Sequence, residues 1–508
     1  MKYVVSLIVS LGLVSACASS SDSPVDEFAS VDGVEPVDEP APERTPDPNE
    51  QKTEPEPVAE PELELAPLPE LLGVPLAEDL NDDPKIIEIN LTAQTSEHVF
   101  IEDTVTPMWT YNGQFPGPAI QARVGDRLIV HFTNNLPDST TVHWHGLRVP
   151  NEMDGAPLVQ QPVQPGETFT YDFKLKDAGS YWYHPHVQTH IQVERGLYGP
   201  IVVHEAEPPA YDVERIVFLD DIRLEMDGNR SPFNLTHPER MHGRYGNVLL
   251  LNGKAVDEGD SLALRHGVVE RWRVMNSANA RTAQLDLMAA EWRVIASDGG
   301  LVPEPFTTEL LQIAPGERYD LEMRWNPESA EDSGELRYWV PVVENEQVKL
   351  APIVLQTLFS NDEEALAAHD VELPEVTLPE WPVEDMPTIT IELDGKPGFN
   401  GQIQWMLNGK VYGQHIPIKV DLGSYHTIDI VNKQAQVHPM HIHGHFFQVI
   451  SRNGKPVVNE AGFKDTVMVG AKETVRLSIL FDNPGQWMYH CHILEHAKMG
   501  MMGVIEVY

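Results

Sequence analysis

The sequence predicts an all-β protein made of three consecutive β-sandwich domains. Its 508 residues exceed what one hydrophobic core usually supports, and 42 prolines with 35 glycines favour frequent turns over long helices. A pattern of turns and strand-like segments also recurs three times along the chain. Together these observations indicate short strands grouped into domains of about 120 to 150 residues.

Each copy of the repeat begins with an Asn-Gly turn, at Asn112-Gly113, Asn252-Gly253 and Asn408-Gly409. An alternating run then ends at an asparagine, over Leu128 to Asn134, Arg271 to Asn276 and Thr427 to Asn432. A second alternating run follows Pro165-Gly166-Glu167, Pro315-Gly316-Glu317 and Ala471-Lys472-Glu473, and a glycine then opens another strand at Gly179, Gly334 and Gly485. The order predicts domains over 84–207, 208–358 and 384–508, with a linker over 359–383.

The first 16 residues have the features of an export signal. Lys2 precedes an apolar run from Tyr3 to Leu13, and small residues follow up to Cys17. Residues 13–17 resemble the bacterial lipoprotein signal, in which Cys17 would be lipidated, and an ordinary secretory signal is the alternative. We therefore expect an exported protein, periplasmic or at the cell surface, that meets a membrane only through lipid on Cys17.

An acidic segment follows the signal. From Ala18 to Glu70 there are 16 acidic residues against Arg44 and Lys52, together with 11 prolines, a composition too polar to form a core. We expect a disordered spacer over 17–83. The net charge of −43 argues against nucleic acid as a partner. Separately, we expect the protein to be a monomer.

Histidines occupy equivalent points of the first and third copies but not of the second. Nine and eleven residues after the closing asparagines stand His143 and His145, Leu285 and Leu287, and His441 and His443. Five residues after the glycines stand His184, Trp339 and His490. This pattern predicts that the first and third domains share an interfacial metal site, with the second domain as a spacer between them.

The histidines form four clusters, at 143–145, 184–186, 438–443 and 490–496. Residues two apart in a strand face the same side, so a His-x-His pair offers two imidazoles to one cavity, and Cys491 points away from His490 and His492. One Cys, two His and a weak thioether define a blue-copper centre, and N-only ligation suits copper clusters that react with dioxygen. For the thioether, Met499 and Met502 compete with Met501.

These clusters resemble the four copper-binding signatures of the multicopper oxidases, the family of bacterial three-domain laccase-like and copper-resistance-type oxidases, from about residue 84 to the end. The resemblance implies cupredoxin-like Greek-key sandwiches that hold four copper ions. The type 1 copper would be bound by His438, Cys491, His496 and Met501, and the type 2 copper by His143 and His441. The type 3 pair would be bound by His145, His184, His186, His443, His490 and His492.

The resemblance also implies catalytic roles. An electron would enter at the type 1 copper, with His438 and His496 facing the donor, and pass from Cys491 through His490 or His492. Asp154 matches the family's acidic residue that supplies protons, although a simple Asp-Gly turn is the alternative reading. Ala497 stands where many bacterial relatives carry a second proton-relaying Glu. Glu495 is a poor substitute, because its side chain should point away.

Two rival functions are disfavoured by the complete ligand set. Copper nitrite reductases do not need all these histidines, and non-catalytic cupredoxin scaffolds typically lack ligands. Between Gln356 and Gly401 the one methionine is Met386, so no Met-rich segment for Cu(I) is evident. We expect dioxygen as acceptor and small phenols or aromatic amines as donors, with Cu(I), Fe(II) and Mn(II) as alternative donors.

Overall fold

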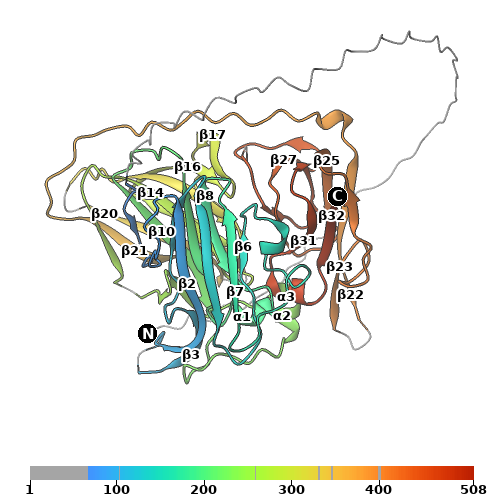
Figure 1. Cartoon of the computed structure of the whole chain (residues 1–508). Helices are drawn as coiled ribbons and strands as arrows, with labels where there is room; N and C mark the ends of the chain where they lie inside the picture. Colours follow the sequence, from blue (N-terminus) through green and yellow to red (C-terminus); the bar gives the residue numbers. More distant parts are fainter. Residues whose placement is uncertain are drawn as a thin grey trace, which may run out of the picture. The chain divides into compact units, whose positions relative to one another are not determined.

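The computed structural model describes residues 67–508 apart from 102, 258, 330–331, 345–346, 399–401 and 461. Strands dominate this part of the chain and form six sheets, while its helices are short (Figure 1). The sheets pack in pairs as three successive sandwiches, which confirms the all-β, cupredoxin-like fold class. Within the described part, the helices lack the length and apolar character needed to cross a membrane.

The first sandwich has two four-stranded sheets. One has the order β3-β2-β5-β7, with β2 (Ile86–His98), β3 (Thr106–Tyr111), β5 (Arg127–Asn134) and β7 (Thr168–Lys174). The other has the order β4-β9-β8-β6, with β4 (Ile120–Arg123), β6 (His143–His145), β8 (Gly179–His184) and β9 (Gly199–His204). Two short helices, η1 (Asn151–Met153) and α1 (Thr189–Gln192), lie between its strands in sequence.

The second sandwich has sheets of eight and five strands. The larger contains β1 (Leu71–Leu72), β10 (Val213–Ile222), β11 (Val248–Leu251), β12 (Lys254–Ala255), β14 (Val269–Asn276), β16 (Glu291–Ser297), β17 (Gly300–Phe306) and β19 (Arg318–Arg324). The smaller contains β13 (Ser261–Leu264), β15 (Ala283–Met288), β18 (Leu311–Ile313), β20 (Ser333–Glu344) and β21 (Gln347–Ser360). Helix α2 (His237–His242) lies between β10 and β11 in sequence.

The third sandwich follows a stretch without helix or strand from Asn361 to Pro382 and the short helix η2 (Val383–Asp385). Its six-stranded sheet contains β22 (Thr388–Pro397), β23 (Ile403–Leu407), β25 (Ser424–Asn432), β27 (Phe447–Arg452), β28 (Lys455–Pro456) and β30 (Thr474–Phe481). Its five-stranded sheet contains β24 (Ile418–Val420), β26 (His438–Ile442), β29 (Thr466–Val469), β31 (Gly485–Cys491) and β32 (Met502–Val507), with α3 (Leu494–Lys498) before β32.

The internal repeat is visible in the hydrogen bonds of the closing asparagines. Strands β5, β14 and β25 end at Asn134, Asn276 and Asn432, as the alternating runs predict. Each of these amides donates to two or more main-chain carbonyls further along its own sandwich. Each opening Asn-Gly turn has positive φ at both residues, which suits Asn followed by Gly. The three sandwiches are therefore built on one plan.

The spacer predicted over 17–83 extends too far, because residues 67–83 are folded. Leu71 and Leu72 form β1, which pairs in parallel with β10 of the second sandwich. Leu71 and Val74 are buried in an apolar cluster, so this stretch belongs to the folded body. The prediction missed these apolar residues because the acidic composition of the preceding segment was extended to them. The rest of the predicted spacer and the export signal lie outside the described residues.

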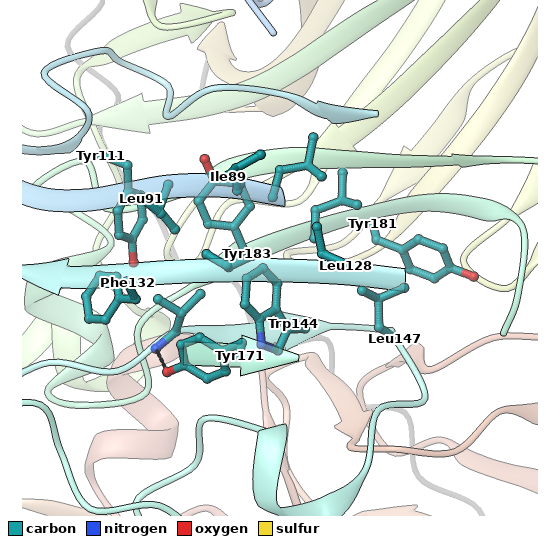
Figure 2. Packing of buried hydrophobic residues seen from close by; sticks show 14 of the residues in the cluster. Ile89, Leu91, Tyr111, Leu128, Phe132, Trp144, Leu147, Tyr171, Tyr181 and Tyr183 are labelled. Atoms are coloured by element: carbon teal, nitrogen blue, oxygen red, sulfur yellow. Dashed lines mark hydrogen bonds between the residues drawn. The ribbon is translucent and has the colours of Figure 1, made fainter. Parts of the chain in front are cut away.

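The core of the first sandwich explains how the first His-x-His pair is presented. Trp144, between His143 and His145, is fully buried and packs beside Tyr171 (Figure 2). Its ring lies 5.1 Å from that of Tyr171 and 5.4 Å from that of Phe173. The Tyr171 hydroxyl accepts a hydrogen bond of 2.9 Å from the Val142 amide. Because neighbouring residues in a strand face opposite sides, anchoring Trp144 in the core turns both histidines outward.

Candidate metal centre

Histidine-bearing strands of the first and third sandwiches meet at their ends. In the first, β6 pairs with β8 so that His143 is opposite His184. In the third, β26 pairs with β31 so that His441 is opposite His490. Rings from the two sandwiches then stack, with centroids 3.9 Å apart for His143 and His443 and 3.8 Å apart for His145 and His441. The shared interfacial site predicted from the repeat forms at this junction.

Several ring nitrogens at this junction are buried without a hydrogen-bond partner: His143 Nε2, His145 Nδ1, His184 Nε2, His441 Nε2 and both nitrogens of His492. Unpaired buried polar atoms are costly, and a convergent group of them calls for an explanation. In His143 and His441 the opposite nitrogen, Nδ1, is 2.8 and 3.0 Å from a main-chain carbonyl, which fixes the ring. Rings fixed in this way with a free nitrogen fit a bound metal ion.

Three further histidines face one another across the junction. His443 Nε2 and His490 Nε2 are 3.1 Å apart, and His186 Nε2 is 3.4 Å from the latter. Burial lowers the pKa of His443 to about 3 and lowers that of His186 and His490 well below 6.5. Their neutral rings are therefore available as ligands at neutral pH. All eight histidines predicted for the type 2 and type 3 coppers lie together here.

The sulfur-containing centre lies on the other face of β31. Cys491 Sγ is 3.6 Å from His438 Nδ1 and 3.8 Å from His496 Nδ1, and the two nitrogens are 3.2 Å apart. Burial raises the pKa of the Cys491 thiol, so a metal ion must replace its proton on binding. Met501 is fully buried in the apolar cluster that contains Cys491, whereas its rivals Met499 and Met502 are partly exposed. Two His, one Cys and a nearby Met fit copper.

This centre is more enclosed than expected. His438 and His496, which are predicted to present the donor-facing edge, are both fully buried, and their facing the donor stays a prediction. His496 Nε2 lies 3.3 Å from the carbonyl oxygen of Met241 on α2, and the Trp405 ring packs 4.2 Å from the His496 ring. The helix α2 of the second sandwich therefore covers the edge of His496.

Asp154 lies beside the histidine-lined cavity. Its side chain is buried, with Oδ2 2.9 Å from His443 Nδ1 and Oδ1 3.3 Å from His143 Nδ1. Burial alone would raise the pKa of Asp154, but the two neighbouring rings hold it well below its usual range. Gly155 has φ of +79°, and a Cβ there would lie 1.9 Å from the Val142 carbonyl. Asp154 and Gly155 therefore form the Asp-Gly turn that was the alternative reading. The Asp154 carboxylate nevertheless contacts the cavity histidines.

Contrary to the prediction, the second sandwich is more than a spacer. Arg318, at the start of β19, donates to both carboxylate oxygens of Asp465 at 2.7 and 2.6 Å, and Asp465 Oδ1 lies 3.1 Å from His145 Nε2. Gly316 lies so close that a Cβ would be 3.0 Å from the His492 ring and 3.1 Å from the His145 ring. The Pro-Gly-Glu turn of the second copy thus reaches the cavity.

Neither Asp465 nor Arg318 could be found from spacing. Asp465 follows His441 by 24 residues, and Arg318 belongs to a domain without ligands. At Ala497 the structure has a buried methyl side chain. Glu495 accepts hydrogen bonds from the Arg244 amide and from Asn279 Nδ2, both in the second sandwich, in agreement with its expected direction away from the centre.

We expect the copper-free protein to lose stability in acid. The unfolded chain protonates His438 and His443 near pH 6.5, whereas burial lowers their folded pKa to about 3, so protons bind preferentially to the unfolded state. Stability present above pH 6.5 is lost as the pH falls toward 3, by about 2 kcal/mol per histidine at pH 5. Denaturant unfolding at pH 7.5 and pH 5 measures this, and equal midpoints would contradict it.

Cupredoxin-like sandwiches with a Cys-His-His centre, joined through one strand to a histidine-lined cavity, define a copper-dependent oxidoreductase. Comparisons with known proteins agree. Family models described as multicopper oxidase match residues 92–208, 230–347 and 382–508. The chain is 33% identical to the multicopper oxidase MmcO of Mycobacterium tuberculosis, over 77% of this chain and 81% of that protein.

Two solved structures are similar to most of the chain. A multicopper oxidase from Campylobacter jejuni, described as a metallo-oxidase, has a TM-score of 0.74 and 29% identity, covering 87% of this chain and 96% of its own. A laccase from Pediococcus acidilactici has a TM-score of 0.73 and 28% identity, covering 88% and 95%. The chain belongs to the multicopper oxidase family. It is an oxidoreductase with copper cofactors and dioxygen as its acceptor.

Proposed function

We propose that the chain binds four copper ions, one of type 1, one of type 2 and two of type 3, and couples oxidation of a small donor to reduction of dioxygen to water. The observation that carries the proposal is the end of β31, where Cys491 lies in one centre while His490 on the strand and His492 directly after it lie in the other. Bound copper would supply one-electron chemistry at the first centre and dioxygen reduction at the second.

The ligands are proposed as follows. The type 1 copper takes His438, Cys491, His496 and Met501, the type 2 copper takes His143 and His441, and the type 3 pair takes His145, His184, His186, His443, His490 and His492. The unpaired ring nitrogens and the short separations between rings support this assignment. The peptide links from Cys491 to His490 and His492 provide a covalent path for electrons between the two centres.

Asp154 is proposed to transfer protons to the histidine-lined cavity. Its contact with His443 Nδ1 and its burial support this role. As a carboxylate it also orients the His443 and His143 rings, so that each keeps one nitrogen toward the cavity.

Purified, copper-loaded protein tests the proposed function. We expect four copper ions per chain, a blue colour, and consumption of one dioxygen for every four electrons taken from the donor. The assay compares a substituted phenol, an aromatic amine, Cu(I), Fe(II) and Mn(II). One copper per chain, or no dioxygen uptake with any of these donors, would refute the proposal.

Phenols or aromatic amines remain the proposed donors, and a metal ion is the second candidate. Burial of His496 under α2 keeps both kinds of donor from touching the imidazole, and a metal ion, being smaller than an aromatic ring, can approach it more closely. The description of the Campylobacter jejuni structure as a metallo-oxidase points the same way.

We predict that α2 restricts bulky donors. Replacing residues 237–242 by a glycine-serine segment of equal length uncovers His496, so turnover of a substituted phenol is expected to rise about tenfold relative to that of Fe(II), which corresponds to about 1.4 kcal/mol. Replacement of the loop 226–229 by a glycine-serine segment of equal length is the control. Dioxygen uptake measures both rates, and equal changes for the two donors would contradict the prediction.

The location of the protein is also a proposal. We infer that it is exported, periplasmic or at the cell surface, monomeric, and anchored through lipid on Cys17. The sequence of residues 1–17 supports an export signal of the lipoprotein type. Cys17→Ser is expected to move the enzyme from the membrane to the soluble fraction with unchanged turnover. Membrane association retained in this variant would argue against the anchor.

A further inference from the structure

Arg318 lies where the three sandwiches meet. Its side chain is fully buried and every N–H group that it carries is directed at a partner. Nε donates to the Ser180 carbonyl of the first sandwich, while Nη1 and Nη2 donate to the Gly316 and Asp298 carbonyls of the second. The remaining bonds reach Asp465 of the third sandwich, at 2.7 and 2.6 Å. A bidentate pair of this kind fixes direction as well as distance.

Asp465 in turn acts on two predicted copper ligands. Its Oδ1 lies 3.1 Å from His145 Nε2 and 3.3 Å from His441 Nδ1. Hydrogen bonding at Nε2 places the proton of His145 there and leaves Nδ1 as the lone-pair nitrogen. That Nδ1 is among the buried ring nitrogens without a partner. Asp465 thereby selects which nitrogen of His145 faces the cavity.

Asp465 is itself a potential metal ligand. A carboxylate oxygen of Asp465 and ring nitrogens of His145 and His441 lie within 4.8 Å of one another, close enough to hold one ion. An unpaired carboxylate at this point would compete for a copper ion or draw it toward the third sandwich. Arg318 occupies both oxygens of the carboxylate, which opposes this competition.

Two glycines show that space is reserved for this arrangement. A Cβ at Gly146 would lie 2.5 Å from Arg318 Nη2 and 2.7 Å from Asp465 Oδ2. Gly316, two residues before Arg318, packs against the His492 and His145 rings. Both glycines have φ of +88°, which a residue with a Cβ adopts only with strain. The backbone on both sides of the ion pair is thus fitted to it.

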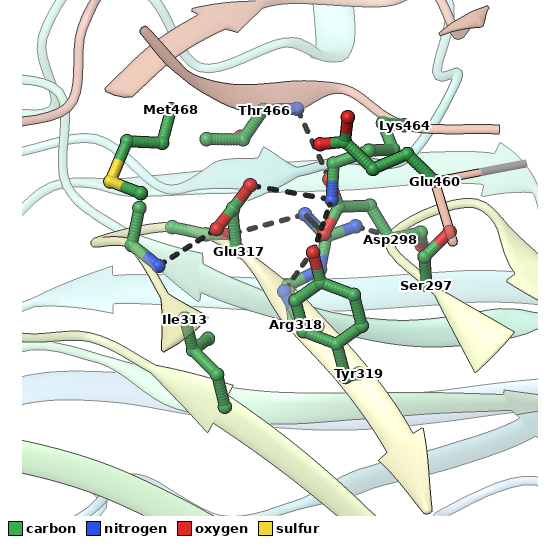
Figure 3. Close-up of polar contacts among 12 residues, drawn as sticks. Ser297, Asp298, Ile313, Glu317, Arg318, Tyr319, Glu460, Lys464, Thr466 and Met468 are labelled. Carbon is green, nitrogen blue, oxygen red and sulfur yellow. Dashed lines mark hydrogen bonds and ion pairs between the residues drawn. The ribbon is translucent and has the colours of Figure 1, made fainter. Parts of the chain in front are cut away.

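Further charged groups surround the pair. Lys464, which is buried, lies 3.2 Å from Asp298 Oδ2 and 3.4 Å from Glu317 Oε1, and Asp298 Oδ1 accepts from the Arg318 amide at 2.8 Å (Figure 3). Asp298 Oδ2 also accepts from the amide of Thr466 at 3.2 Å. Two cations and their carboxylates therefore hold the second and third sandwiches together directly behind the histidines.

We propose that Arg318 is a positioning residue for the copper cluster. It holds Asp465 as an orienting acceptor for His145 and keeps that carboxylate from binding copper. The second sandwich, which has no predicted ligand, thereby controls the ligand set between the other two. This inference rests on the proposed function, since it concerns the copper ions assigned there.

The experiment compares Arg318→Met, Arg318→Lys and the double variant Arg318→Met/Asp465→Asn in copper-loaded protein. Copper per chain, the electron paramagnetic resonance signal of the type 2 copper and the near-ultraviolet absorption of the type 3 pair are measured. We expect Arg318→Met to weaken copper binding at the cluster by roughly 10- to 100-fold and to alter the type 2 signal, while the blue colour is unchanged. Arg318→Lys is expected to recover part of the loss, because it keeps the charge without the fork.

The double variant removes the competing carboxylate and both members of the buried ion pair, so it is expected to fold and to regain the wild-type type 2 signal. Arg273→Met is the matched control. Arg273 is also fully buried, pairs with Glu214 and Asp320, and donates to Ser180 Oγ, but the contacts of its guanidinium do not include a predicted ligand. We expect this variant to lower the melting temperature and to leave the copper signals unchanged.

The outcomes separate the two proposals. If wild-type protein binds fewer than four copper ions, the proposed function fails whatever Arg318 does. If wild-type protein binds four and folded Arg318→Met gives the same copper content and signals, the inference is overturned. An Arg273→Met variant that changes the copper signals as much as Arg318→Met would also overturn it. Should Arg318→Met fail to fold, a folded double variant with an abnormal type 2 signal would count against the inference.

Discussion

Cys491→Ser is expected to abolish the blue colour and to reduce donor oxidation to the uncatalysed background, while most of the copper in the histidine-lined cavity remains. The colour arises from thiolate ligation, and a serine hydroxyl cannot replace that soft donor. The His490 ring lies on the opposite face of β31, and that of His492, directly after the strand, lies beside His184, so neither ring is displaced by the change. Visible absorption, copper content and dioxygen uptake measure the three effects.

Met440→Leu is the control for this variant. Met440 carries another buried sulfur, directly opposite Cys491 on β26, and it belongs to the same apolar cluster. We expect it to retain the colour and the turnover. An intense visible band that persists in Cys491→Ser would mean that the type 1 copper is assigned to the wrong sulfur.

Asp154→Asn is expected to slow reoxidation of the enzyme by dioxygen by roughly 10² or more, a typical contribution of one side chain that accepts a proton and passes it on. Asparagine keeps an oxygen that can accept from His443 Nδ1, so the ring orientation and the copper content are preserved. It cannot cycle a proton. Reduction of the type 1 copper by donor without oxygen is expected to stay normal, and stopped-flow measurement separates the two half-reactions.

Asp227→Asn provides the matched control, because Asp227 also precedes a glycine but is exposed on a loop. We expect it to leave both half-reactions unchanged. Ala497→Glu, which restores the family's second carboxylate, is expected to rescue Asp154→Asn in part. Unchanged reoxidation in copper-replete Asp154→Asn would contradict the proton-transfer role and leave Asp154 only the role of orienting the two rings.

Much of the site was predictable because its ligands follow strand periodicity. His143 and His145 share one strand face, and the repeat marks their counterparts His441 and His443. The same periodicity separates Cys491 from its flanking histidines, and the structure brings each group to its own side of β31. These features depend on local geometry, which a sequence carries directly.

Contacts between sandwiches could not be predicted in the same way. Asp465, Arg318 and the Met241 carbonyl reach the centres from other elements, and no spacing rule connects them to the ligands. Their positions depend on which surfaces meet after each sandwich has folded. The predicted spacer failed at β1 for a related reason, since Leu71 and Leu72 become strand residues only by pairing with β10.

The pleat of β31 has a consequence for how this enzyme can change during evolution. Its register is set on both edges, by Met440 opposite Cys491 on β26 and by Met502 opposite His490 on β32. Insertion or deletion of a single residue would turn the thiol toward the histidine-lined cavity and an imidazole toward the sulfur-containing centre. A substitution in the strand changes one side chain and leaves the others in place. A change of its length moves every following side chain to the other face and so exchanges the two ligand sets. Length variation among descendants of this chain is therefore expected in its loops and not in β31.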